Sequence, residues 1–291
     1  MKRRTALFMP GNNASMILNA GIHGADGIIL DLEDAVAPGE KDAARIMVRN
    51  ALKTMKYSCE ILVRINGLST AFWKPDLNYI VPYAPDALVI PKCEYTEEIK
   101  MLDDYITNIE KENNISVGSV KLMCLLESAT GIKNGYEIAS ASSRVESIAL
   151  GAIDLTYDLG TELSDDGAEM QYSRAKMLID ARAAGVYAYD TSYPDVENIE
   201  GLIKWTKFCK ALGYDGRPVI SPSHVNYVNE IFTPSQEEIA YAQEVLDATE
   251  EGVRQGKGAV TLHGSMLDAP HIKRARQVLE LANAIKRGGR K

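Results

Sequence analysis

Two carboxylates follow short apolar runs near the middle of this 291-residue chain. Glu127 directly follows the run Lys121–Leu126, and a second run of similar length leads into Asp154. A carboxylate just past a buried strand is held on rigid backbone and faces the open end of a sheet. Mg²⁺ prefers one or two protein carboxylates together with substrate oxygens, so the pair predicts a magnesium site. The alternative is that each carboxylate only caps the helix that follows it.

Two more acidic residues, Asp31 and Glu33, follow another apolar run in the segment LDLEDAV. Four carboxylates gathered at one edge of a sheet would repel one another strongly unless a cation lay between them. Since no histidine or cysteine stands at these positions, the residue types favour Mg²⁺, with Mn²⁺ possible, over zinc. A set of helix caps and ion pairs with nearby arginines is the structural alternative.

Arg64 lies in the otherwise apolar segment LVRING, where an arginine is costly to bury unless it meets an anion. It could simply pair with Asp31 or Glu33. It could instead face the site, where its guanidinium suits a carboxylate or a developing enolate oxygen. We favour the second interpretation, which assigns Arg64 to catalysis and to substrate binding.

Short apolar runs alternate with amphipathic stretches along the chain, which is typical of repeated βα units and a parallel sheet. Eight such units predict an α/β fold of the TIM (β/α)₈ barrel type, and a doubly wound open sheet is the alternative. The expected strands are Thr5–Met9, Gly27–Leu30, Ile61–Ile65, Ala87–Ile90, Lys121–Leu126, Ser147–Ile153, Val186–Tyr189 and Pro218–Ile220.

A barrel places its chemistry at the C-terminal ends of the strands, and nearly every expected strand here ends in polar or turn residues. Pro10 follows the first strand and Asp190 the seventh, so we assign both to substrate binding. Lys92 follows the fourth strand, and His224 follows the eighth, where it could face the site. This rim therefore has the residue types of a catalytic face.

Helix-compatible segments lie between the strands and continue beyond the last one. We expect a barrel catalytic domain at residues 1–231 and a C-terminal helical extension at residues 232–291. The extension is expected to pack on the barrel or on a neighbouring subunit, with a connector at residues 256–264. The expected helices are Asn13–Ile22, Glu40–Lys53, Thr96–Asn113, Gly131–Ser140, Tyr172–Ala184, Val196–Leu212, Ser235–Gln255 and Ile272–Ile285.

The bulk composition is ordinary for a globular protein, with 46% hydrophobic and 25% charged residues. A formal net charge of −8 favours solubility and argues against a nucleic-acid partner. No apolar run approaches the roughly 20 residues that a membrane span needs, and the N-terminal apolar run is too short for an export signal. The four cysteines are scattered without metal-binding or redox spacing, which predicts free thiols and a cytoplasmic location.

Several motifs, taken in order, resemble one known family. They are RRTALFMPGNN, GADGIILDLEDAVAPGEKDAAR, VRING, IPKCE, LLESATGI, ALGAIDLTYDLG, AYDTSYPD and GKGAVTLHGSMLDAPHI. Together they resemble the citrate lyase β-subunit-like proteins, a branch of the HpcH/HpaI aldolase (phosphoenolpyruvate/pyruvate) superfamily. The resemblance covers essentially the whole chain. It implies a TIM barrel, usually a homotrimer, that uses Mg²⁺ to make or break a carbon–carbon bond.

The resemblance also implies roles for individual residues. Glu127 and Asp154 match metal ligands, and Arg64 matches the arginine beside the substrate. Asp31 and Glu33 match acidic site residues.

The resemblance also gives a role to a backbone segment. Gly151, Ala152 and Ile153, leading into Asp154, match the loop that holds the keto-acid carboxylate.

One position departs from the family pattern. Relatives resemble LDGKMID or LNGKMID in the tail, and in the malyl-thioester type an aspartate from a neighbouring subunit acts on the acetyl methyl group. This chain has LHGSMLD, which places His263 at the matching position. Because an imidazole titrates near neutrality, His263 is suited to protonate an enolate and is assigned as catalytic.

These observations predict a Mg²⁺-dependent carbon–carbon lyase that cleaves or forms a 3-hydroxyacyl thioester of citryl, citramalyl or malyl type. The partners would be a 2-oxo acid and an acyl-CoA or acyl-carrier-protein thioester. One alternative is an aldolase that acts on free 2-keto acids. Another is a non-catalytic subunit that binds CoA esters in a larger lyase complex.

Overall fold

The computed structural model describes residues 2–256 and 260–288. The chain divides into two compact units, Met1–Glu230 and Ile231–Lys291. Within the described residues, no helix is both long and apolar enough to cross a membrane.

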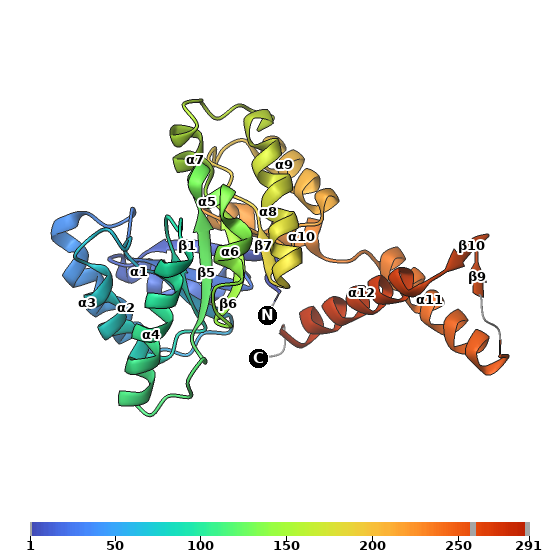
Figure 1. The fold of residues 1–291 in the computed structure, drawn as a ribbon, viewed down its shortest axis with the longest axis horizontal. Coiled ribbons are helices and arrows are strands. Elements are labelled where there is room, and N and C mark those ends of the chain that lie inside the picture. The colour runs from blue at the N-terminus through green and yellow to red at the C-terminus, as the bar shows by residue number, and fades with distance from the viewer. Residues whose placement is uncertain (1, 257–259, 289–291) are drawn as a thin grey trace. The chain divides into compact units, whose positions relative to one another are not determined.

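Eight parallel strands form the sheet of the first unit, in the order β7-β6-β5-β4-β3-β2-β1-β8. Figure 1 shows part of this sheet, with β1, β5, β6 and β7 labelled. The two end strands meet through a parallel bridge between Tyr189 and Gly216 and a hydrogen bond from the Asp190 N–H to the Gly216 carbonyl. The sheet therefore closes, and the open-sheet alternative is wrong. The strands are β1 Thr5–Pro10, β2 Gly27–Asp31, β3 Glu60–Arg64, β4 Ala87–Ile90, β5 Lys121–Leu126, β6 Val145–Leu150, β7 Tyr187–Tyr189 and β8 Arg217–Val219.

The strands are runs of buried apolar residues because a barrel strand is covered on one face by helices and on the other by the barrel interior. Alternate side chains point into the barrel and form its inner core, with Phe8 packed against them. That core consists of Ala6, Ile29, Leu62, Ala87, Val89, Met123, Leu125, Ala149 and Tyr189.

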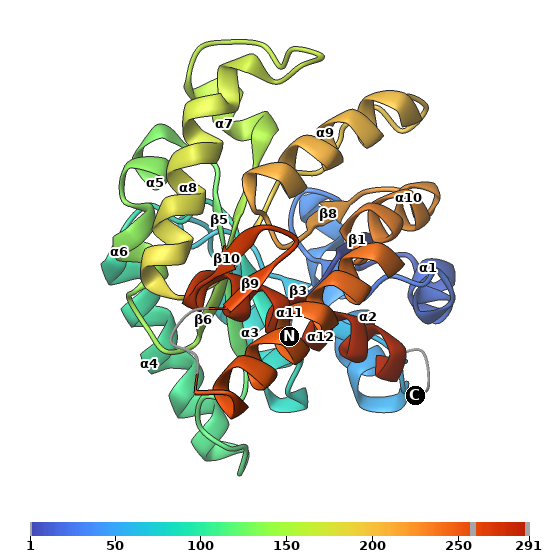
Figure 2. The ribbon, with the colours of Figure 1, turned by 90° about the vertical axis from the view of Figure 1, so that its right-hand side faces the viewer.

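Helices surround the barrel in the first unit (Figure 2). They are α1 Ala14–Leu18, α2 Lys41–Thr54, α3 Trp73–Ile80, α4 Thr96–Glu112, α5 Ala129–Lys133, α6 Gly135–Ala139, α7 Ala152–Asp158, α8 Gln171–Ala184, α9 Ile199–Leu212 and α10 Pro222–Phe232. The polar segment 159–170 between α7 and α8 contains no α-helix or strand.

Three of these helices were not expected from the sequence. In α3 a proline stands in the first turn, where its missing N–H breaks no intrahelical hydrogen bond. Helix α10 begins at Pro222 directly after the last strand. The predicted strand Ser147–Ile153 extends into the first two residues of α7, because the apolar run continues past the end of β6. The strand ends at Leu150, and Gly151 becomes the residue before the helix.

The second unit contains α11 (Gln236–Arg254), the antiparallel hairpin of β9 (Val260–Leu262) and β10 (Ser265–Leu267), and α12 (Ala269–Gly288). Ser235 and Glu238 cap the start of α11 reciprocally. The expected connector is only partly tested: residues 260–262 form β9, and residues 257–259 lie outside the described residues. The two long helices and the hairpin share a small apolar cluster that includes Ala242, Val245, Leu267 and Ala275.

Candidate active site at the C-terminal end of the barrel

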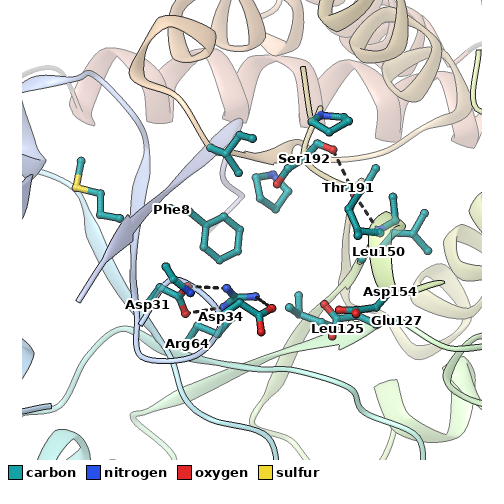
Figure 3. A pocket seen from close by; sticks show the side chains of 18 of the residues that line it. Phe8, Asp31, Asp34, Arg64, Leu125, Glu127, Leu150, Asp154, Thr191 and Ser192 are labelled. Atoms are coloured by element: carbon teal, nitrogen blue, oxygen red, sulfur yellow. Dashed lines mark hydrogen bonds and ion pairs between the residues drawn. The ribbon is translucent and has the colours of Figure 1, made fainter. Parts of the chain in front are cut away.

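A cavity of about 490 Å³ opens where the barrel strands end. Its wall includes residues from the ends of most strands and from the loops that follow them (Figure 3). Pro10, Gly151, Ala152 and Ile153, which were expected to bind substrate, all line it. The cavity also takes in Asp31, Asp34, Arg64, Glu127 and Asp154, so acidic side chains outnumber basic ones on its wall.

Arg64 ends β3 and is paired across the neighbouring strand with Asp31, the last residue of β2. Its Nε and Nη2 donate to the two carboxylate oxygens of Asp31 over 2.7 and 2.6 Å. A third nitrogen, Nη1, lies 3.0 Å from Glu33, and the guanidinium lies over the ring of Phe8. Burial alone would lower the pKa of Arg64, but the hydrogen bond and charge of Asp31 outweigh it and raise that pKa. Arg64 therefore both forms an ion pair with Asp31 and lines the cavity.

Asp31 and Glu33 are held in place by backbone contacts as well as by the arginine. Asp31 accepts the N–H groups of Glu33 and Ala35 over 2.9 and 3.1 Å. The buried ammonium of Lys41 donates to the carbonyls of Leu32 and Glu33 over 2.8 and 2.6 Å. Burial raises the pKa of Glu33, and together with the charges of nearby carboxylates it exceeds the opposing effect of Arg64 and Lys92.

Glu127 is buried directly after β5, with a side chain that is not a helix cap: Ser128 caps α5 instead. It accepts the backbone N–H of Lys92 over 3.0 Å. A Cβ on Gly151 would lie 2.4 Å from the Glu127 side chain, so a glycine is needed to leave room for this carboxylate. Burial, then the charges of Glu33 and Asp154, raises the pKa of Glu127 to about 7.

Asp154 lies in the first turn of α7 and not at the strand end, and its side chain is 43% exposed. Figure 3 shows its carboxylate beside that of Glu127, facing Arg64 and Asp31 across the cavity. Glu127 and Asp154 repel each other, and this repulsion contributes to the raised pKa of Glu127. Two carboxylates placed together without an arginine between them are a donor set that suits a hard divalent cation.

The residues present therefore fit a magnesium ion held by Glu127 and Asp154. In the described part of the chain, no cluster of three or more His, Cys, Asp or Glu side chains could enclose a metal by itself. Two protein carboxylates are enough for Mg²⁺ when water or substrate oxygens complete its shell.

Asp190 does not lie on the cavity wall, and its assignment to substrate binding is not supported by its place in the structure. It is fully buried below the rim. Arg174 donates to it over 2.9 Å and Arg217 over 2.6 Å. Their charges lower the pKa of Asp190 despite its burial. Sequence position alone could not reveal this, because the two arginines come from α8 and β8.

His224 is also fully buried, with Nε2 3.2 Å from the carbonyl of Val196, so it does not face the cavity. Among the cavity residues to which no role was assigned from the sequence, Thr191 and Ser192 follow β7 and line the wall. Thr191 accepts the Ala152 N–H through its hydroxyl over 3.1 Å, and this bond ties the loop after β7 to the start of α7. The AYDTSYPD motif contained both residues, but no pattern singled them out.

His263 belongs to the second unit, in the turn between β9 and β10, where its φ of 48° is left-handed. Its Nε2 lies 2.8 Å from a carboxylate oxygen of Glu244 on α11, and its ring stacks on Tyr241 at a centroid distance of 6.4 Å. The side chain is exposed, so it is accessible within its own unit.

A closed parallel (β/α)₈ barrel whose strand ends enclose an acidic cavity defines a TIM-barrel enzyme. Residues 4–222 match the HpcH/HpaI aldolase/citrate lyase family, and residues 171–285 match a family of carbon–carbon bond lyases of the TIM-barrel fold. The chain belongs to the HpcH/HpaI aldolase/citrate lyase family, as its motifs indicated.

Individual relatives agree over nearly the full length. The citrate lyase subunit beta of Leuconostoc mesenteroides subsp. cremoris is 44% identical over 97% of this chain and 94% of that protein. The mitochondrial citramalyl-CoA lyase of Rattus norvegicus is 30% identical over 98% of this chain and 87% of that protein. The crystal structure of the protein CitE from Mycobacterium tuberculosis, with magnesium, acetoacetate and coenzyme A, is 30% identical with a TM-score of 0.76, covering 96% and 98% of the two chains.

Proposed function

We propose that this protein is a Mg²⁺-dependent carbon–carbon lyase that cleaves or forms a 3-hydroxyacyl thioester. The products of cleavage are a 2-oxo acid and an acyl thioester of CoA or of an acyl-carrier protein. Relatives named as a citrate lyase subunit and a citramalyl-CoA lyase support this reaction class. A related structure that contains magnesium, acetoacetate and coenzyme A supports the same classes of ligand.

The observation that carries the proposal is the placement of Glu127 beside Asp154. In the described residues, Glu127 makes no ion pair, although it is buried and repelled by neighbouring carboxylates. A protein gains nothing in stability from such an arrangement, because an unpaired buried charge is costly. A divalent cation would remove that cost, so the arrangement is what a metal site requires.

When bound by Glu127 and Asp154, Mg²⁺ would supply Lewis-acid polarisation of the oxygens at the reacting carbon. The protein's own residues do the rest. Glu33 takes the proton of the substrate hydroxyl as the carbon–carbon bond breaks, and the carbon that bore the hydroxyl becomes the carbonyl carbon of the 2-oxo acid. The bonding electron pair goes to the acyl fragment, which leaves as a thioester enolate. Arg64, held rigidly by Asp31, donates to the developing negative charge.

His263 completes the cleavage by giving a proton to the enolate carbon. Its contact with Glu244 orients the ring in the way that a carboxylate orients a catalytic imidazole. Gly151, Ala152 and Ile153 lie on the cavity wall, where the backbone can position the 2-oxo acid. Asp31 acts as a positioning residue, since the described hydrogen bonds of its side chain hold Arg64 and the loop after β2.

The test is to incubate the purified full-length protein with Mg²⁺ and citryl-, citramalyl- or malyl-CoA and to follow release of 2-oxo acid. We expect turnover with at least one thioester, loss of turnover on chelation, and no turnover in Glu127→Gln. A Glu137→Gln variant, changed on the outer helix α6, is the matched control and should retain full activity. Cleavage of free 2-keto acids alone would favour the aldolase alternative, and CoA-ester binding without turnover would favour a non-catalytic subunit.

Assembly and location belong to the same proposal. We expect a homotrimer in the cytoplasm, free or within a lyase complex, in which the second unit packs on the barrel or on a neighbouring subunit. Light scattering coupled to size-exclusion chromatography measures the oligomeric mass directly. A monomeric and fully active protein would contradict the trimer.

A further inference from the structure

Lys92 contacts three carboxylates of the site, yet the reaction outlined above leaves it without a role. Its backbone N–H donates to Glu127 over 3.0 Å. Its ammonium nitrogen lies 3.5 Å from Glu33 and 3.9 Å from Asp154. A single residue therefore joins the metal-binding pair to the proposed base.

The backbone of Lys92 is unusual. Two residues after β4, its φ is 53°, a left-handed conformation that few residues other than glycine and asparagine adopt readily. Non-glycine residues in such conformations gather at functional sites. Because glycine would also offer an N–H to Glu127, and with less strain, the part that only lysine supplies is the ammonium.

The two cations of the site differ in what they can still bind. Arg64 directs Nε and Nη2 to Asp31 at close hydrogen-bonding distances, and its side chain is 12% exposed. The Lys92 side chain is 50% exposed, and both its carboxylate contacts are longer than the 2.7–2.9 Å typical of a charge-assisted hydrogen bond. An ammonium has three donors on a flexible stem, so Lys92 keeps donors for an incoming anion.

Apart from Arg64, the charged side chains on the cavity wall are acidic and repel anions. A 2-oxo acid can be held through its keto oxygen and its first carboxylate, but a second carboxylate would meet Asp34 and Asp154 on the cavity wall. Like charges placed this close disfavour binding unless a cation lies between them. Lys92 is the cation beside Glu33 and Asp154 that still has donors to offer.

We propose that Lys92 is a specificity residue whose ammonium binds the second free carboxylate of a dicarboxylic 2-oxo acid and of the hydroxyacyl thioester that yields it. This rests on the proposed lyase function and deepens it. Lys92 would favour substrates that release oxaloacetate-type acids over those that release pyruvate-type acids.

Equilibrium binding tests this without turnover. Titration calorimetry would measure the affinities for oxaloacetate and pyruvate at saturating Mg²⁺ in the wild type, Lys92→Asn and Lys92→Arg, with Lys100→Met on α4 as a distant control. Asparagine tolerates the left-handed backbone and keeps the N–H to Glu127. Mg²⁺ binding is measured first, and Lys92→Asn should bind Mg²⁺ at least as tightly, since a neighbouring positive charge is removed.

We expect the wild type to prefer oxaloacetate. Lys92→Asn should weaken oxaloacetate binding by about 10- to 100-fold, the usual loss for a hydrogen bond to a charged group, and leave pyruvate binding unchanged. Lys92→Arg should keep most of the preference, and Lys100→Met should keep all of it.

Other outcomes separate the two proposals. Equal losses for both acids, or unchanged oxaloacetate binding, in Lys92→Asn would overturn the role of Lys92 and leave the lyase proposal intact. The same conclusion follows if the wild type prefers pyruvate. If the wild type binds neither acid in the presence of Mg²⁺, both proposals fail.

Discussion

Glu127 is a buried carboxyl group whose ionisation is unfavourable in the folded protein. Burial and the charges of Glu33 and Asp154 raise its pKa to about 7, well above the ordinary 4.5 of a glutamate. The folded state therefore binds the proton more tightly than the unfolded state does. This contribution to stability is fully present below pH 4.5 and is lost as the pH rises through 7.

Glu127→Gln should stabilise the metal-free protein at alkaline pH. Glutamine keeps the shape of the side chain without the charge, so at pH 8 the free energy of unfolding should rise by about 3 kcal/mol, the value of the pKa difference. At pH 4.5 the gain should vanish. Urea denaturation of both proteins at the two pH values measures the difference. A destabilised Glu127→Gln at pH 8, or a gain independent of pH, would contradict the assignment.

At pH 8, Mg²⁺ should make the wild type more stable than Glu127→Gln. A ligand that binds only the folded state stabilises it according to its affinity and concentration. The wild type should gain stability as Mg²⁺ is added, and Glu127→Gln should gain much less. The melting temperatures of the two proteins, measured across a Mg²⁺ titration, report both gains in stability. Ca²⁺-free buffer with added chelator gives the baseline. Equal gains in the two proteins would remove Glu127 from the metal site.

At the scale of elements, the junction between β6 and α7 decides where Asp154 lies. The apolar run through this segment conceals the end of the strand, and Gly151 marks it only once the structure is known. The backbone there is ordinary, with φ of −106°, so the need for glycine is one of space and not of conformation. That space is occupied by Glu127 from the neighbouring strand β5.

Gly151→Ala should therefore displace Glu127. The added Cβ would lie 2.4 Å from the Glu127 side chain, so the carboxylate must move. We expect Mg²⁺ affinity to fall by about 10- to 100-fold, as for other changes to groups that orient a metal ligand. Gly39→Ala is the control, because nothing lies within 4 Å of its added Cβ. Calorimetry measures both, and unchanged Mg²⁺ affinity in Gly151→Ala would show that Glu127 does not need this space.

At the scale of the whole molecule, the barrel carries the carboxylates and Arg64, whereas His263 belongs to the second unit. In the malyl-thioester relatives that the chain resembles, an aspartate in the tail serves the site of a neighbouring subunit, and His263 stands at the matching position. Such a site would be incomplete in a single chain, and its function would depend on closed, symmetric assembly.

Mixed oligomers of Glu127→Gln and His263→Asn should recover activity that neither variant has alone. In a closed trimer that contains both variants, an intact Glu127 meets an intact His263 of the next subunit at one site in three, so we expect about one third of wild-type activity. The two variants are co-expressed with different tags, the mixed oligomers are purified through both tags, and 2-oxo-acid release is measured. No recovery in mixed oligomers would place both residues of a site in the same chain. Substantial activity in His263→Asn alone would remove His263 from catalysis, since a lost proton donor should cost about 10²- to 10⁴-fold.

The sequence alone determined the eight strands, the barrel class and the family, because strand-length apolar runs and short motifs are local patterns. It also placed Glu127, Arg64 and Asp31 at strand ends, and β-strand geometry then brought them to one rim. Tertiary structure decided which of the rim's charges are available. Asp190 is neutralised by Arg174 and Arg217, which come from elements 16 and 27 residues away. Lys92 has a left-handed backbone and contacts three carboxylates, and neither fact is encoded in the spacing of residues. A charge at a strand end is predictable from the local sequence, but its partner comes from a distant segment and depends on the closed barrel.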